Sequence, residues 1–219
     1  MALLMRDFGS DEFGARLTKL LEPGALAEVT TAEETILKAA YMDWRREVVL
    51  RSDGRSHTRY TVGHPGAVAI LALDAEDESR VTRESPMIFV RQFRSATKRL
   101  LLEIPAGTLD SVDGQREDAA TAAMRELEEE AGLIASSWRH LRSFYTAPGF
   151  TDEWMEIHLA LGLRPAGEGR RAPDPDEAIE PVRLTVAEAA EGVRRGAIVD
   201  AKSLIAVSLA ERLASGGRP

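Results

Sequence analysis

The 219-residue chain contains no cysteine, and this absence excludes several chemistries at once. Disulfide bonds, thiolate metal sites and a cysteine nucleophile all require that residue. The chain also has no run of 18 uninterrupted apolar residues, so we expect no membrane-spanning helix and no membrane partner. Its first residues reach the acidic Asp7 too early for a secretory signal. Together these absences favour a cytoplasmic protein.

Basic residues are fewer than acidic residues. Lysine and arginine total 28 and aspartate and glutamate total 36, which gives a net charge of −8. Because a nucleic-acid-binding domain usually carries a basic footprint, we expect no nucleic-acid partner. An acidic protein can still bind a polyanionic substrate when a divalent metal ion lies between them. The position of the acidic residues is therefore more informative than their number.

The first 62 residues differ in pattern from the rest. A short amphipathic helix is expected over residues 10–21, with Ser10 as its N-cap. Residues 27–62 are strand-rich, and the turn signal Ser52-Asp53-Gly54 predicts a hairpin. His64-Pro65-Gly66 then interrupts the pattern. We therefore predict an N-terminal extension over residues 1–62 and a main domain over residues 63–219.

The main domain mixes strands and helices. A continuous apolar run from Ala67 to Leu73 predicts a buried strand, and Pro105-Ala106-Gly107 is expected to stop a later one. This irregular alternation favours an α+β fold with a mixed sheet over a doubly wound parallel sheet. The other predicted strands cover residues 87–93, 99–104, 138–146, 154–162 and 182–184, and the predicted helices cover 117–131, 186–195 and 201–214.

The predicted helix over residues 117–131 carries an unusual concentration of acid. Glu126 and Glu130 share one face at i,i+4 spacing, and Arg125 and Glu129 have the same spacing one step round. Two such glutamates repel by about 0.2–0.5 kcal/mol on an isolated helix. Negative charge near a helix C-terminus also opposes the helix dipole. The arrangement suits a bound hard cation such as Mg²⁺ or Mn²⁺. A solvated acidic face is the alternative interpretation.

These residues resemble the Nudix box, G-x5-E-x7-R-E-U-x-E-E-x-G-U, in which U is aliphatic. The opening glycine departs from that pattern, because Gly107 precedes Glu117 by nine intervening residues rather than five. We interpret the difference as a four-residue insertion, which leaves the conformation of this loop open. The positions that match in register are Glu117, Arg125, Glu126, Leu127, Glu129, Glu130, Gly132 and Leu133.

Four further segments resemble the ADP-ribose pyrophosphatase branch of the Nudix hydrolases. A proline after the box, here Pro148, is the feature usually associated with that branch. The resemblance spans residues 40–210. It implies the Nudix fold, a mixed β-sheet sandwiched between helices, with a strand-rich N-terminal extension that forms a homodimer. The four segments cover residues 63–69, 90–94, 103–107 and 145–153.

The resemblance implies Mg²⁺-dependent hydrolysis of ADP-ribose to AMP and ribose 5-phosphate, with Mn²⁺ as a possible substitute. Another nucleoside diphosphate sugar, such as GDP-mannose or UDP-glucose, is an alternative substrate for the same chemistry. A non-catalytic Nudix ligand sensor is an alternative of another class. Such a sensor would lack a metal-binding glutamate or carry a DNA-binding domain, whereas Glu126, Glu129 and Glu130 are all present.

The resemblance assigns a metal site to the predicted helix and the segment before it. Glu126 and Glu130 would be the main metal ligands, and the backbone carbonyl of Ala106 would be an additional ligand. Glu129 would hold Arg125 through a salt bridge or share a metal. The number of metal ions stays open.

The resemblance also assigns a general base and substrate contacts. Glu177 would be the general base. Arg91 would contact phosphate, and Glu103 would bind a substrate hydroxyl or a metal-bound water. Tyr60 would stack on the base. An ion pair at the edge of the core is the alternative for Arg91 and Glu103, and a simple strand aromatic is the alternative for Tyr60. Alternative bases in the same loop are Asp174 and Asp176.

Overall fold

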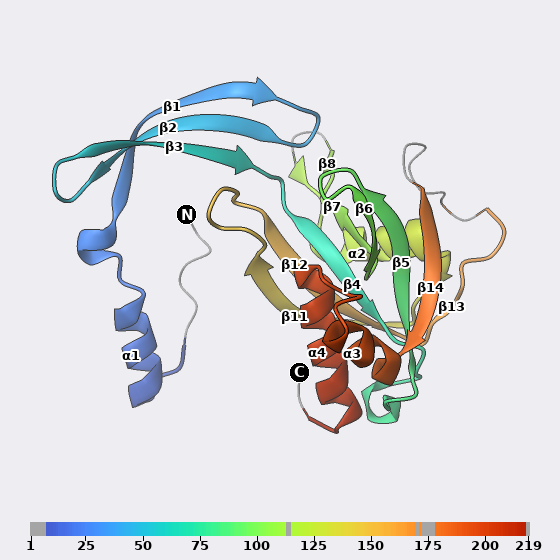
Figure 1. Ribbon diagram of the computed structural model, residues 1–219. Coiled ribbons are helices and arrows are strands. Elements are labelled where there is room, and N and C mark those ends of the chain that lie inside the picture. The colour runs from blue at the N-terminus through green and yellow to red at the C-terminus, as the bar shows by residue number, and fades with distance from the viewer. Residues whose placement is uncertain (1–7, 113–114, 170, 172–177, 218–219) are drawn as a thin grey trace. The chain divides into compact units, whose positions relative to one another are not determined.

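The computed structural model describes residues 8–112, 115–169, 171 and 178–217. The chain divides into two compact units (Figure 1). The first unit comprises residues 1–39 and 43–62, and the second comprises residues 40–42 and 63–219. The roles that the sequence analysis gave to the two parts of the chain stay predictions at this point.

The described part of the first unit contains the helix α1, the short 3-10 helix η1 and a three-stranded antiparallel sheet. Its helix starts one residue later than expected, because Asp11 rather than Ser10 is the N-cap and its Oδ1 accepts a hydrogen bond from the Gly14 N–H at 2.7 Å. The sheet has the strand order β1-β2-β3, and every residue of β1 is exposed. The elements are α1 (Glu12–Leu20), η1 (Gly24–Leu26), β1 (Glu28–Lys38), β2 (Asp43–Arg51) and β3 (Ser56–Gly63).

The second unit is built on two main sheets. One has the order β11-β12-β4-β7, in which β12 and β4 run parallel and the other neighbours antiparallel. The other is antiparallel with the order β14-β5-β6. The strands of these sheets are β4 (Ala67–Ala72), β5 (Pro86–Arg94), β6 (Arg99–Glu103), β7 (Ala106–Thr108), β11 (Ser137–Tyr145), β12 (Trp154–Leu161) and β14 (Ile179–Thr185).

Helices and short ladders complete the second unit. No helix among the described residues is both long and apolar enough to cross a membrane. The remaining elements are η2 (Glu78–Arg80), α2 (Ala119–Ala131), α3 (Val186–Arg194), α4 (Ala201–Ala214), and the paired strands β8 (Ser111–Val112) with β9 (Gln115–Arg116) and β10 (Leu133–Ile134) with β13 (Arg164–Pro165).

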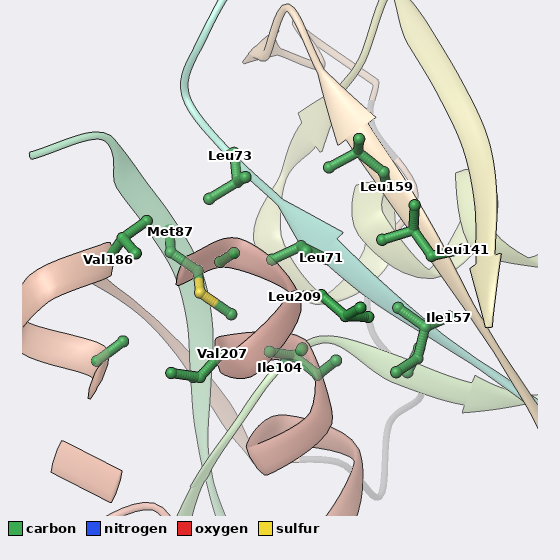
Figure 2. Packing of buried hydrophobic residues seen from close by; sticks show 14 of the residues in the cluster. Leu71, Leu73, Met87, Ile104, Leu141, Ile157, Leu159, Val186, Val207 and Leu209 are labelled. Carbon is green, nitrogen blue, oxygen red and sulfur yellow. The ribbon is translucent and has the colours of Figure 1, made fainter. Parts of the chain in front are cut away.

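Strand β4 lies at the centre of the core, and all six of its residues are buried. Because successive side chains of a strand point to opposite faces, Ala69 and Leu71 pack with residues of α3 and α4, as Figure 2 shows for Leu71. Val68 and Ile70 pack on the other face with residues of α2. The mixed sheet therefore lies between helices, and the predicted α+β class is confirmed.

The structure of the segment around Pro105 differs from the prediction. Pro105-Ala106-Gly107 was expected to stop a strand and lead into a loop, but Ala106–Thr108 forms β7 and pairs with β4. Strand β6 ends at Glu103, and Pro105 has no N–H with which to continue its ladder. Its carbonyl still accepts from the Ile70 N–H at 2.8 Å, which keeps the chain beside β4. Residues 106–108 thus belong to the sheet that underlies α2.

The insertion ahead of the acidic helix also has regular structure. Ser111 pairs with Arg116 and Val112 with Gln115, so the insertion forms a short antiparallel ladder where a loop was expected. The helix begins at Ala119 rather than at Glu117, because Asp118 is its N-cap. Two-residue strands carry too little pattern to be recognised from sequence.

Candidate active site

Helix α2 presents the two central glutamates of the site. Asp118 starts the helix by accepting from the Thr121 N–H at 3.0 Å, and Gly132 ends it in the left-handed conformation with φ of 65°. Leu127, in the middle of the helix, packs into the hydrophobic core. Glu126 is 7 % exposed and Glu130 is 4 % exposed, although both are acidic. Buried carboxylates require polar partners, and the segment 106–107 supplies part of that environment.

Both glutamates lie against the backbone of Ala106 and Gly107. Glu130 Oε2 accepts a hydrogen bond from the Ala106 N–H at 2.9 Å. The Glu126 carboxylate occupies the place where a side chain at residue 107 would begin, because an ideal Cβ on Gly107 would lie 1.8 Å from Glu126 Oε1. Strand β7 therefore holds both carboxylates at one edge of the sheet, and glycine at 107 leaves the space that Glu126 fills.

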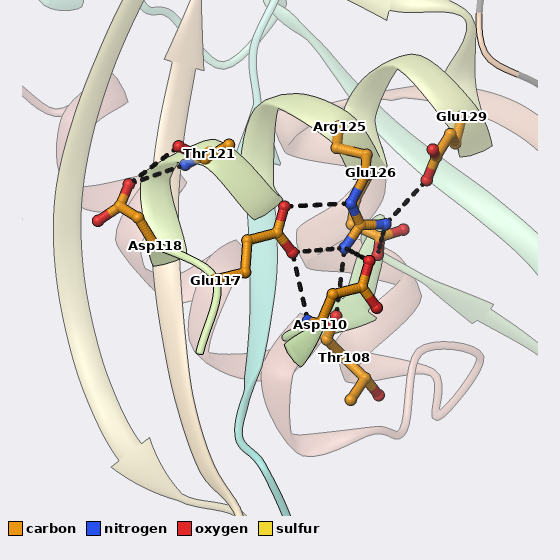
Figure 3. A network of polar contacts seen from close by, with 8 residues as sticks. All are labelled: Thr108, Asp110, Glu117, Asp118, Thr121, Arg125, Glu126 and Glu129. Atoms are coloured by element: carbon orange, nitrogen blue, oxygen red, sulfur yellow. Dashed lines mark hydrogen bonds and ion pairs between the residues drawn. The ribbon is translucent and has the colours of Figure 1, made fainter. Parts of the chain in front are cut away.

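Arg125 is surrounded by carboxylates (Figure 3). Its Nη1 donates to Glu126 Oε1 at 2.7 Å and to Glu129 Oε2 at 2.9 Å. Its Nη2 donates to Glu117 Oε2 at 3.0 Å and to the Thr108 carbonyl at 3.3 Å. The guanidinium thus links the helix to β7 and to the chain ahead of the helix. Glu117 precedes the N-cap and lies outside the helix, yet it still reaches Arg125.

The charges of this network favour ionised groups. Burial lowers the pKa of Arg125, but the hydrogen bonds that it donates to Glu117 and Glu129, together with the charge of Glu126, outweigh burial, so the net pKa is raised. Burial raises the pKa of Glu117, but the hydrogen bonds that its carboxylate accepts from Arg125 and from the Asp110 N–H dominate, so that pKa is lowered. One guanidinium cannot neutralise all of these carboxylates. The site keeps an excess of negative charge, which suits a cation.

The donor set fits a hard divalent cation that is shared with a substrate. Among the residues that the structure describes, no three His, Asp or Glu side chains form a complete metal cage. Magnesium is usually bound by one or two carboxylates together with substrate phosphates and waters, rather than by a cage of protein ligands alone. Glu126 and Glu130, both held on β7, match the protein part of such a site.

Two of the predicted substrate contacts lie on neighbouring strands in ion pairs. Arg91 on β5 pairs with Glu180 on β14, and both side chains are exposed. Glu103 at the end of β6 is 2 % exposed and accepts from Arg94 Nε and Nη2, both at 2.9 Å. The ion-pair alternative therefore describes both residues in this structure, and their contacts with substrate stay predictions.

The remaining predicted residues do not belong to the described part of the second unit. Tyr60 lies on β3 of the first unit and is 65 % exposed. Glu177 and its alternatives, Asp174 and Asp176, lie outside the described residues. Their roles stay predictions from the resemblance.

Three residues near the site were missed by the sequence analysis. Arg94 and Lys202 both donate to the Glu103 carboxylate, and Ser203 accepts from the N–H of the residue that follows Glu103. Lys202 and Ser203 lie 99 residues from their partners. No local signal could have linked them, since neither belongs to a motif.

Comparison with known proteins agrees with this arrangement. A family model described as the NUDIX domain matches residues 63–205, which includes all of β4 to α3. The chain belongs to the NUDIX family. Hydrolases of this family generally use divalent metal cations, in agreement with the acidic donor set on α2.

Two relatives cover most of the chain. An ADP-ribose pyrophosphatase of Bacillus subtilis is 38 % identical over 183 residues, which is 84 % of this chain and 92 % of that protein. An ADP-ribose pyrophosphatase of Mycobacterium tuberculosis is 38 % identical over 192 residues, covering 85 % of this chain and 84 % of that protein. This chain is thus similar to NUDIX enzymes along nearly their whole length.

A solved structure has a similar fold. The crystal structure of an ADP compounds hydrolase matches with a TM-score of 0.69 and covers 86 % of this chain and 95 % of that chain. Sequence identity is 21 %, so this similarity concerns the NUDIX fold alone.

Proposed function

We propose that this chain hydrolyses the pyrophosphate of ADP-ribose to AMP and ribose 5-phosphate in a reaction that requires Mg²⁺. The observation that carries the proposal is the pair Glu126 and Glu130, buried and held on the backbone of β7. The NUDIX match and the similarity to two ADP-ribose pyrophosphatases support the choice of reaction and substrate.

The proposed roles follow from the chemistry of a charged diphosphate. When bound, a divalent cation would offset the negative charge of the diphosphate and lower the pKa of a coordinated water. Glu126 and Glu130 would hold it, with the Ala106 carbonyl as the additional ligand. Arg125 and Glu129 would orient Glu126 through the hydrogen bonds described above. These assignments are our proposal.

The attack of water on phosphorus also needs a general base and residues that bind the substrate. We keep Glu177 as the proposed general base, with the two neighbouring aspartates as alternatives. Arg91 is the proposed phosphate contact, which requires that its pairing with Glu180 yield to the substrate. Tyr60 is the proposed stacking partner of the adenine.

The test is hydrolysis of a substrate panel at millimolar Mg²⁺, with an EDTA control. The panel contains ADP-ribose, GDP-mannose, UDP-glucose, NADH and a diadenosine polyphosphate. We expect kcat/KM for ADP-ribose to exceed the others by at least about tenfold, because discrimination depends on binding the whole substrate in the transition state. EDTA should abolish the activity, and Mn²⁺ should restore part of it.

The alternative outcomes of the panel bear separately on the substrate, the metal and the reaction. Activity concentrated on GDP-mannose or UDP-glucose would keep the reaction and replace the substrate. Activity that survives EDTA would contradict the metal assignment. No activity on any member of the panel would refute hydrolysis and favour the ligand sensor.

We further propose that the first unit mediates homodimerisation. Its sheet exposes two apolar cross-strand pairs, Leu37 with Trp44 and Val29 with Leu50. Monomeric proteins seldom expose large contiguous apolar surface, and such surface commonly marks an interface. A second copy of the chain is the partner that the resemblance implies. The cytoplasmic location is likewise kept as a prediction from composition.

Light scattering after gel filtration tests the dimer. We expect a particle of twice the chain mass of 24.0 kDa at micromolar concentration. Leu37→Glu should shift the population to monomer, because a charge would replace an exposed apolar side chain. Lys38→Glu is the matched control, since the next residue of a strand points to the opposite face. A wild-type monomer would refute the proposal.

A further inference from the structure

The short segment that carries the two carboxylates is itself held from a distant helix. Residues 103–107 connect β6 to β7, and they end at the two residues against which Glu126 and Glu130 lie. Any displacement of this segment would displace both carboxylates. What fixes its position is therefore part of the site.

One anchor is a buried hydrogen bond from the start of α4. The Ile104 N–H donates to Ser203 Oγ at 2.9 Å, and both residues are completely buried. Ser203 is placed by the N-cap of its helix, because its own N–H donates to Asp200 Oδ1 at 3.2 Å. A buried N–H that loses its acceptor is costly, so this bond resists a shift of Ile104.

The second anchor is the ion pair between Lys202 and Glu103, the residues that directly precede Ser203 and Ile104. Lys202 Nζ donates to Glu103 Oε2 and, at 3.0 Å, to Asp200 Oδ1. The side chains of Lys202 and Glu103 are both largely buried. Arg94 on β5 also donates to Glu103, so the carboxylate has two cationic partners. Glu103 is thereby committed to the contact between β6 and α4.

We infer that Lys202 and Ser203 are positioning residues for the metal-binding carboxylates. They act through Glu103 and Ile104, which lie three and two residues before Ala106, the first of the two residues against which Glu126 and Glu130 lie. The inference rests on the proposed function, since it concerns the same metal site. Partners of this indirect kind typically change metal affinity by about 10–100-fold when they are removed.

Ser203→Ala is the sharpest perturbation, because it removes one oxygen from a buried position. We expect the Kd for Mn²⁺, measured by electron paramagnetic resonance on the full chain without substrate, to rise about tenfold. The Mg²⁺ concentration that gives half-maximal hydrolysis should rise in parallel. The KM for ADP-ribose at saturating metal should stay near the wild-type value, because the substrate contacts are unchanged.

Ser208→Ala is the matched control, since Ser208 is an exposed serine on the same helix. Its Mn²⁺ affinity should equal that of the wild type. Lys202→Met provides a second test should Ser203→Ala fail to fold. Lys202→Arg should restore most of the affinity, because arginine can still donate to Glu103.

The outcomes separate this inference from the proposed function. The inference would be overturned if Ser203→Ala and Lys202→Met fold, lose only stability and bind Mn²⁺ with wild-type affinity. A wild-type enzyme that binds Mn²⁺ but does not hydrolyse ADP-ribose would overturn the proposed function and leave the positioning role standing. A wild-type protein that binds no Mn²⁺ would overturn both.

Discussion

Replacing Gly107 by alanine would place a methyl group where the Glu126 carboxylate lies. An ideal Cβ at this position would be 1.8 Å from Glu126 Oε1 and 2.0 Å from its Cδ, whereas ordinary contact begins at 3.4 Å. The backbone of Gly107 does not have a positive φ, so the substitution acts through this clash alone. The carboxylate must therefore move by roughly 1.5 Å to restore normal contact.

The displacement should cost far more activity than stability. A misplacement of about 1 Å in a catalytic arrangement can cost about 10²-fold in rate, so we expect kcat/KM to fall by at least that factor. The clashing atoms are the end of a side chain that can rotate, so we expect the free energy of unfolding to fall by about 1–3 kcal/mol, as in other overpacked sites. Hydrolysis at saturating Mg²⁺ and chemical denaturation measure the two effects.

Gly149→Ala is the matched control. No atom lies within 4 Å of an ideal Cβ at Gly149, and its φ is ordinary. This variant should keep wild-type activity and stability. A Gly107→Ala enzyme with activity within about threefold of the wild type would refute the assigned position of Glu126 in the metal site, because the misplacement argument requires a much larger loss.

Three further predictions concern the charged groups around the site. Glu130→Gln should lower kcat by at least about 10²-fold, comparable to the loss of one major electrostatic group, and a near-normal rate would contradict its role as a metal ligand. Arg125→Met should lower the free energy of unfolding in urea by about 3 kcal/mol, because it leaves partly buried carboxylates without their cation; an unchanged midpoint would contradict the network in Figure 3. Burial raises the pKa of Glu103, but Arg94 and Lys202 outweigh it, so the net pKa lies below its ordinary value of 4.5. The ionised carboxylate therefore stabilises the fold above pH 4.5, and that contribution disappears as the pH falls through the lowered pKa. An acid titration followed by circular dichroism should show a shallower loss of stability below that pH for Glu103→Gln, and identical slopes would refute the assignment.

The long elements were predictable because their signals are local. The apolar run from Ala67 to Leu73 became β4, and the periodic segment over residues 201–214 became α4 with the expected bounds. Hydrophobic periodicity is read within a dozen residues, and burial then follows from it. The α+β class follows from the order of these elements, and the family resemblance rests on motifs that each lie within one short segment of the chain.

Short elements were not predictable in this way. The strands β7, β8 and β9 are two or three residues long, so they show no period. They exist because a neighbouring strand supplies hydrogen-bond partners, as β4 does for residues 106–108. The choice of Asp11 over Ser10 as an N-cap is similar, since both residue types cap helices and geometry selects between them.

In the candidate site too, relations within one helix were predictable and contacts between distant segments were not. The i,i+4 spacing within one helix was enough to predict that Glu126 and Glu130 share a face, because the 3.6-residue period decides that relation. It also determined the pairing of Arg125 with Glu129, for the same reason. The space that Gly107 leaves for the Glu126 carboxylate and the contact of Lys202 with Glu103 become visible only in the folded chain. Those contacts join segments 19 to 99 residues apart, and such pairings depend on how the sheets and helices pack rather than on any local pattern.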